Sequence, residues 1–151
     1  MLERILKKAT LIDVPIILIS AVAIVSIWRG ATIHDFAFIG PNAVFTNDLV
    51  PRAKIYRKEY HRTIVQEGAS VGANATLVCP VTIGRYALVG AGSVVTKDVP
   101  DYSIVYGSPA RFKGWICTCG ERLEFGKDEK ARCGCGIDYL KEGDVIREMR
   151  R

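Results

Sequence analysis

Four of the five cysteines stand in two short motifs near the C-terminus, where their spacing could hold a metal ion. The motifs are C-T-C-G at Cys117 and Cys119 and C-G-C-G at Cys133 and Cys135. Two such turns joined by a hairpin-length spacer form the arrangement of a zinc ribbon, in which paired thiolates close a tetrahedral site. The usual turn has two residues between its cysteines, and here there is one. We expect structural zinc at these four residues, with free or disulfide-bonded thiols as the alternatives.

The other residues that could bind metal or move protons are few. Cys79 stands alone, and we expect it to be a small buried residue. A catalytic zinc site built from histidine needs three convergent imidazoles, whereas the chain has only His34 and His61. We expect His34 to lie at the surface. No recognisable motif surrounds His61, so we do not expect it to act as a general base.

These residues must be positioned by a repeat with a period of six. Its large members are Val65, Val71, Leu77, Ile83, Val89 and Val95. Four residues after each comes a smaller one, namely Ala69, Ala75, Val81, Ala87, Ser93 and Val99. A period of six fits neither a helix nor a flat strand, and fixed repetition predicts a solenoid, here a triangular β-coil. We expect positive φ angles at the glycines that follow the aliphatic residues, Gly72, Gly84 and Gly90.

The repeat is interrupted once, and the interruption predicts a loop. Upstream, the period continues through Ile27, Ile33, Ile39 and Phe45. Twenty residues then separate Phe45 from Val65, so about fourteen must leave the coil. Long loops in compact domains are often functional. The basic residues of 52–62 could attract a phosphate-rich ligand or simply form a solvated surface.

Length and composition limit what the chain can be. Its 151 residues leave room for one main domain and a small appendage. Because a stack of so few coils exposes its faces, we expect a homo-oligomer. The net charge is +5, but no aromatic and basic pattern of a nucleic-acid module is present, so nucleic acid is not an expected partner.

The N-terminal segment contains an apolar run whose uncharged part, 14–28, has fifteen residues. A membrane-spanning helix needs roughly 20. Pro15 interrupts the run, and Ile and Val dominate it, as in buried strands. We expect residues 1–26 to form an irregular cap without stable membrane insertion. A membrane or export segment and a degraded or truncated N-terminus are the alternatives.

Three segments resemble one known family. They are FIGPNAVFTNDLVPRA at 38–53, the stretch from GASVG to GSPAR at 68–111, and GWICTCGERL at 114–123. Together they resemble the left-handed β-helix, or hexapeptide-repeat, acyltransferases. The closest subgroup N-acetylates the 3-amino group of UDP-2-acetamido-3-amino-2,3-dideoxy-glucuronate, a precursor of surface polysaccharide. The resemblance implies a cytoplasmic homotrimer with active sites between subunits, although the apolar run before residue 27 departs from the regular repeats of the family.

The resemblance also implies roles for particular residues. Asn47 would orient the reacting amine, and Asp48 would hold the loop or accept a proton. Arg52 and Arg29 would bind the nucleotide-sugar substrate through its carboxylate or diphosphate. Because a neutral amine is already a good nucleophile, positioning worth ~7 kcal/mol or more could replace a strong base.

Acetyl-CoA is the cofactor that the resemblance implies. Its pantetheine arm would pass Ala73 and Ala91, where small side chains allow a close approach to the backbone. Thr96 and Lys97 would meet the adenosine end, and Arg111 the 3′-phosphate.

The expected fold class is all-β. It comprises a left-handed parallel β-helix over 27–112 with a loop at about 47–63, followed by a zinc-ribbon-like extension over 113–151. The expected function is acetyl-CoA-dependent N-acetylation of a UDP-amino sugar of the uronate type. The alternatives are another amino sugar nucleotide, a small hydroxyl acceptor, or a non-catalytic module that binds a partner through the β-helix and the ribbon.

Overall fold

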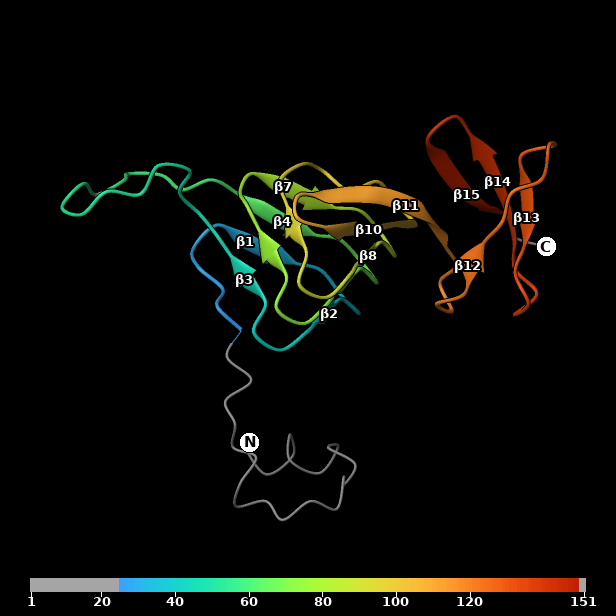
Figure 1. Cartoon of the computed structure of the whole chain (residues 1–151), viewed down its shortest axis with the longest axis horizontal. Helices are drawn as coiled ribbons and strands as arrows, with labels where there is room; N and C mark the ends of the chain where they lie inside the picture. The colour runs from blue at the N-terminus through green and yellow to red at the C-terminus, as the bar shows by residue number, and fades with distance from the viewer. Residues whose placement is uncertain (1–24, 150–151) are drawn as a thin grey trace, which may run out of the picture.

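The computed structural model describes residues 25–149, which form fifteen β-strands (Figure 1). The predicted N-terminal cap lies almost entirely outside these residues. Across the described part of the chain, no helix has the length and apolar character to cross a membrane. Every element that the structure assigns in residues 25–149 is a strand, so the all-β prediction is confirmed for this part of the chain.

Nine short strands form the three walls of a triangular coil. The first wall contains β1 (Ala31–Ile33), β4 (Thr63–Val65) and β7 (Val81–Ile83). The second contains β2 (Phe38–Ile39), β5 (Ser70–Val71) and β8 (Leu88–Val89). The third contains β3 (Val44–Phe45), β6 (Thr76–Leu77) and β9 (Val94–Val95). Neighbouring strands within each wall are parallel, as expected for successive turns of a solenoid.

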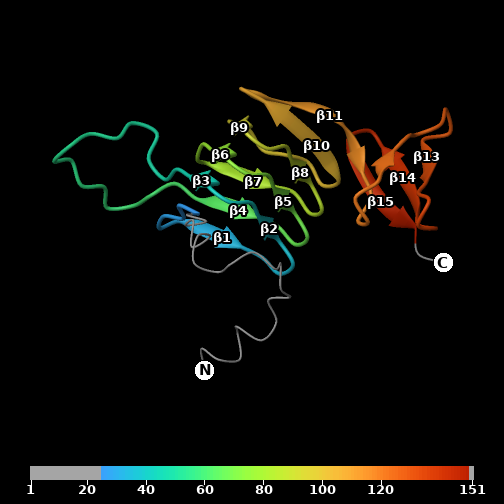
Figure 2. The same cartoon turned by 60° about the horizontal axis from the view of Figure 1, so that its bottom comes forward.

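The strand register shows where the repeat is interrupted. Ala31 of β1 pairs with Thr63 of β4, 32 positions later, whereas Thr63 pairs with Val81 of β7, only 18 positions later. The difference of 14 residues equals the predicted insertion. These residues project from the coil as a long loop at the end opposite the C-terminal unit (Figures 1 and 2).

The two repeating positions fill the interior of the coil. From Val65 to Val99, every large or small member of the repeat is at most 5% exposed. Ile33 pairs with the buried Val65 but is 38% exposed, and Ile27 is 49% exposed. Both belong to the first described coil, so no described coil packs below them.

The prediction of positive φ at Gly72, Gly84 and Gly90 is wrong, because none of the three has a positive φ. Glycine occurs at these positions because the neighbouring part of the chain leaves no room for a β-carbon. A β-carbon on Gly72 would lie 2.5 Å from the backbone nitrogen of Ala91 in the next coil. The left-handed conformation occurs two residues after Gly72, at Asn74, where φ is 57°.

We therefore expect Gly72→Ala to lower the free energy of unfolding by about 1–3 kcal/mol, because the added methyl group overlaps the next coil. The matched control is Gly92→Asn. Gly92 has a φ of 67° and open space around it, and its counterpart one coil lower is Asn74. This control should change stability by less than about 0.5 kcal/mol. Urea unfolding measures both values, and equal destabilisation would contradict the steric explanation.

The chain leaves the coil through a hairpin that continues into the C-terminal unit. The hairpin consists of β10 (Ser103–Gly107), which pairs with β8, and β11 (Ala110–Ile116), which pairs with β10 and β12 (Arg122–Leu123). The C-terminal sheet contains β13 (Lys130–Arg132), β14 (Asp138–Glu142) and β15 (Val145–Met149). The boundary predicted between residues 112 and 113 thus falls inside β11.

An aromatic column joins the coil to the C-terminal unit. The ring of Tyr86, at a corner of the coil, stacks on Tyr102 with 5.4 Å between centroids. Tyr102 in turn meets the ring of Tyr139 in β14 edge-on at 5.7 Å. Tyr102 and Tyr139 belong to one buried cluster with Trp115 and Cys117, so the second core begins at the surface of the first.

Candidate active site

The loop begins and ends at one point, where the two predicted site residues Asn47 and Arg29 meet His61, which was not expected to be catalytic. The backbone N–H of His61 donates to the carbonyl oxygen of Asn47 at 3.1 Å. The side-chain amide of Asn47 donates to the carbonyl oxygen of Arg29 at 3.3 Å. Asn47 and His61 line the same cleft of about 270 Å³ at the base of the loop.

Asp48 is committed to the structure of the loop. Its Oδ1 accepts a hydrogen bond from the N–H of Val50 at 2.9 Å, and its Oδ2 lies 2.9 Å from Nε of Arg57. Arg57 also donates to the carbonyl oxygen of Val50 at 2.8 Å. The guanidinium of Arg57, and then the N–H of Val50, hold the pKa of Asp48 below its usual value. A stabilised carboxylate is a weak base, so the geometry favours the loop-holding role for Asp48.

Arg57 lines this cleft as the charged partner of Asp48, and from the sequence it was only one of the basic residues of 52–62. The only sequence signal for such a pair is an acidic residue, Asp48, at the start of a basic loop. Arg52, which the resemblance places at the substrate, instead donates to the carbonyl oxygen of Pro51 at 2.9 Å. It is not among the residues that line the cleft.

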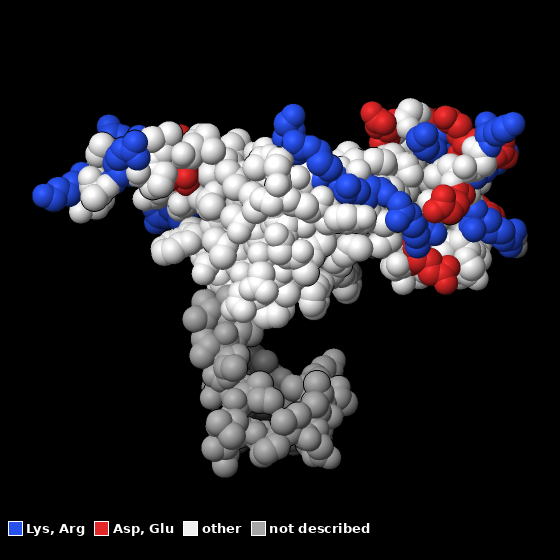
Figure 3. All heavy atoms as spheres, in the orientation of Figure 1, with Lys and Arg blue, Asp and Glu red and all other residues white. Residues whose placement is uncertain are grey.

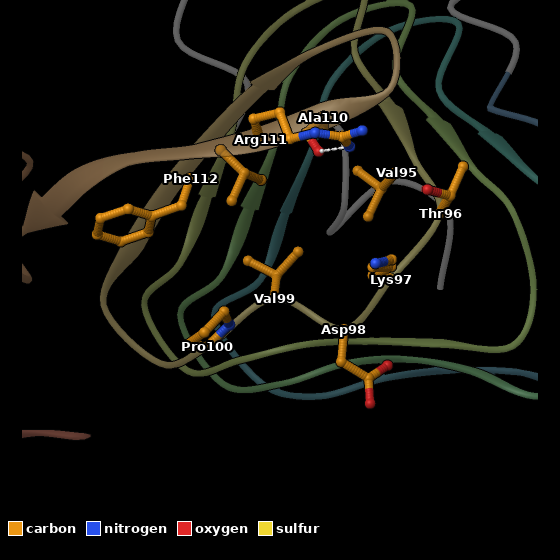
Figure 4. Close-up of a pocket in the computed structure, with 10 residues that line it drawn as sticks. Val95, Thr96, Lys97, Asp98, Val99, Pro100, Ala110, Arg111 and Phe112 are labelled. Atoms are coloured by element: carbon orange, nitrogen blue, oxygen red, sulfur yellow. Dashed lines mark hydrogen bonds between the residues drawn. The ribbon is translucent and has the colours of Figure 1, made fainter. Parts of the chain in front are cut away.

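A second cleft, of about 280 Å³, lies at the last coil below the β10–β11 hairpin. Thr96, Lys97 and Arg111, all predicted to bind the cofactor, line it together (Figure 4). Arg111 is exposed, and its guanidinium donates to the carbonyl oxygen of Ala110 at 3.0 Å. Lys and Arg atoms form a band along this hairpin (Figure 3). Two cations in one cleft suit a phosphate-bearing ligand.

Apolar residues complete this cleft. The side chains of Val95 and Val99, at most 5% exposed, lie in its middle in Figure 4. Pro100 and Phe112 also line it, and they border a further cleft that contains Trp115. Phe112 was not predicted from the sequence. Its place directly after the GSPAR motif is the only sequence signal for it.

Ala73 and Ala91 occupy one corner of the coil, in successive layers. The N–H of Gly92 donates to the carbonyl oxygen of Ala73 at 2.8 Å, which places the two alanines one above the other. Ala91 is exposed and Ala73 is half-buried. Neither lines the cleft of Lys97 and Arg111. They form a separate strip of small side chains on the coil.

The four predicted metal ligands also come together. The Sγ atoms of Cys117, Cys119, Cys133 and Cys135 lie within 4.8 Å of one another. Cys79 is 1% exposed inside the coil, as expected of a small buried residue.

Known proteins with a similar sequence contain the same six-residue repeat. Residues 62–97 match the family model described as bacterial transferase hexapeptide (six repeats). A dTDP-3-amino-3,6-dideoxy-alpha-D-galactopyranose 3-N-acetyltransferase of Aneurinibacillus thermoaerophilus is 50% identical over 92 residues, which cover 61% of this chain and 47% of that protein. The bifunctional protein GlmU of Thermotoga maritima is 46% identical over 97 residues, covering 60% of this chain and 22% of GlmU.

A solved structure shares the fold. AntD, an N-acyltransferase of Bacillus cereus solved with dTDP and coenzyme A, superposes with a TM-score of 0.51 at 21% identity. The match covers 60% of this chain and 55% of that one. The coil is thus a left-handed parallel β-helix built from hexapeptide repeats. The chain spans about half the length of the Aneurinibacillus relative.

Proposed function

We propose that this chain is an acetyl-CoA-dependent N-acetyltransferase acting on the amino group of a nucleotide-activated sugar. The observation that carries the proposal is the 50% identity, over 92 residues, to a relative named as a 3-N-acetyltransferase of a dTDP-3-amino sugar. Two clefts support it, one with an amide-bearing residue at the loop base and one with two cations at the last coil.

In this proposal the last coil binds the cofactor. Lys97 and Arg111 pair with the phosphates of acetyl-CoA, and Thr96 meets the ribose. Pro100 and Phe112 give the adenine an apolar wall, because they line the same cleft as the two cations. The pantetheine arm follows the strip of small residues at Ala73 and Ala91 and carries the thioester along the coil.

The loop base binds the amine. Asn47 orients the neutral amino group as it attacks the thioester carbonyl, so that a C–N bond forms and the C–S bond breaks. The attacking nitrogen loses one proton and the departing sulfur gains one, so CoA leaves as the thiol. Because the nucleophile needs no strong base, positioning and hydrogen bonds to the developing oxyanion provide most of the acceleration.

The identity of the sugar is the finer part of the proposal. The resemblance of the loop entry favours UDP-2-acetamido-3-amino-2,3-dideoxy-glucuronate, a surface polysaccharide precursor, over the 6-deoxy sugar of the Aneurinibacillus relative. A uronate carboxylate needs a cation to bind it. Arg29 can provide this cation, because its backbone carbonyl accepts a hydrogen bond from Asn47 at the loop base. A thiol-release assay with both sugar nucleotides tests the choice. Arg29→Ala should lower activity on the uronate more than on the 6-deoxy sugar, and turnover of neither would oppose the enzymatic proposal.

One observation favours a second candidate, transfer to a hydroxyl group. His61 lines the same cleft as Asn47. A hydroxyl acceptor requires a general base, and histidine is the usual one. The kinetics of His61 variants separate the two functions, because loss of a general base would abolish transfer to a hydroxyl group.

We further propose a cytoplasmic homotrimer in which the loop contacts the neighbouring subunit. Ile55 and Tyr56 of the loop are 57% and 92% exposed in a single chain. Light scattering at micromolar concentration should give about three times the 16.6 kDa of one chain. A monomer mass would exclude the trimer and any active site shared between subunits.

A further inference from the structure

The four cysteine side chains of the C-terminal unit converge with the spacing of a metal site. The Sγ atoms of Cys117 and Cys135 are 3.5 Å apart, and those of Cys119 and Cys133 are 3.4 Å apart. Four zinc–sulfur bonds of about 2.3 Å in a tetrahedron place neighbouring sulfur atoms about 3.8 Å apart. Small movements of the thiols therefore suffice to admit the ion, since all four sulfur atoms lie within 4.8 Å of one another.

The two turns that present these thiols have the same backbone structure. The N–H groups of Gly120 and Gly136 each donate, at 2.9 Å, to the carbonyl oxygen of the cysteine three residues earlier. Both glycines have positive φ, 97° and 92°, and a β-carbon on either would meet nothing within 4 Å. Glycine is thus favoured by backbone conformation. This turn lets two thiols with one residue between them face a common point, despite the short spacing.

Hydrogen-bond donors point at one of the sulfur atoms. The hydroxyl of Tyr139 lies 3.2 Å from Sγ of Cys117, and the N–H of Cys119 lies 3.5 Å from the same atom. Tyr139 is fully buried, so its polar end is aimed into the cluster rather than at solvent. Donors of this kind support metal-bound thiolates, because they stabilise the charge on sulfur.

We infer that Cys117, Cys119, Cys133 and Cys135 bind one Zn²⁺ ion as thiolates and that this ion stabilises the C-terminal unit. Binding releases the thiol protons to solvent and involves no oxidation. Thiolate ligands select zinc over magnesium or calcium. Four protein ligands leave no coordination position for water, so the role is structural and independent of the proposed acetyl transfer.

The fold indicates how far the effect of the ion should extend. Cys117 and Cys133 are buried in one cluster with Tyr139 and Ile146, which come from β14 and β15. Loss of the ion should therefore open the β13–β15 sheet, because metal-binding energy becomes folding energy in small units. Arg111, by contrast, is held by its pairing with Tyr106 across the β10–β11 hairpin. The cleft at the last coil should keep its structure.

Elemental analysis of the full chain, purified without chelator, tests the inference. The wild type should contain one zinc per chain and Cys133→Ser only background zinc. The matched control is Cys79→Ser, which replaces a buried cysteine outside the cluster and should keep its zinc. Hydrogen exchange should show faster exchange of β13–β15 amides in Cys133→Ser, with coil amides unchanged. Zinc loss in the Cys79 variant would overturn the assignment of ligands.

Metal exchange keeps the inference testable if Cys133→Ser does not fold. Wild-type protein stripped by chelator should take up one Co²⁺ and show the visible absorption of a tetrahedral cobalt thiolate, which added Zn²⁺ should abolish. If the purified wild type contains no metal and takes up no Co²⁺, the proposed metal site is wrong. Iron in place of zinc would overturn the choice of ion.

Discussion

Asn47→Ala should lower kcat by about 10²–10³-fold with little change in KM for acetyl-CoA. The reason is that Asn47 is proposed to orient the amine and stabilise charge best in the transition state, as oxyanion-hole donors do. Its side chain is already fixed by a hydrogen bond to the carbonyl oxygen of Arg29, so the group is positioned before substrate binds. Steady-state kinetics with the preferred amino sugar nucleotide measures the effect.

Leu49→Ala is the matched control for this experiment. Leu49 lines the same cleft but is 51% exposed, so its truncation should leave kcat within about twofold of wild type. His61→Ala should likewise change little. If His61→Ala abolished turnover while Asn47→Ala remained active, general-base catalysis would dominate and the acceptor would be a hydroxyl group.

The second large effect should appear in the binding of the cofactor. Lys97→Ala and Arg111→Ala should each raise KM for acetyl-CoA by about tenfold, because each removes a charge-assisted contact to phosphate. The effect should shrink as salt rises, because both side chains are exposed and their charges are screened.

Acetyl-pantetheine, a thioester without the nucleotide, provides the control. With this donor the Lys97 and Arg111 variants should equal the wild type, because the phosphates are absent. A general defect with both donors would instead indicate that these variants disturb the last coil. Unchanged KM with acetyl-CoA would place the cofactor elsewhere and would contradict the proposed division between the two clefts.

The periodic part of the fold was predictable because its information is local. Leu77 faces the same interior as Val71 and Ile83, which lie six positions away on the neighbouring walls, so one steric rule repeats along the chain. The same arithmetic revealed the insertion between Phe45 and Val65, which the strand register confirms. The spacing of the four cysteines likewise predicted their convergence, because each pair is presented by its own short turn.

What the sequence could not decide depends on segments that meet only in the folded chain. Glycine is required at position 72 because the backbone of the next coil lies too close for a β-carbon. This contact involves a residue far along the chain, so the expected φ of a turn does not predict it. Arg57 meets Asp48 because of the path of a loop without periodicity.

The sequence by itself therefore determined the coil, the loop position and the candidate ligands, because each follows from short-range spacing. The tertiary structure alone decided which of these residues share a cleft. It placed His61 beside Asn47 and paired Arg57 with Asp48, whereas Arg52 is not among the residues that line this cleft. It also continued β11 across the expected domain boundary, because pairing with β10 holds the whole strand in one sheet. Contacts between residues far apart in the chain depend on loop closure and packing, and a linear pattern does not encode them.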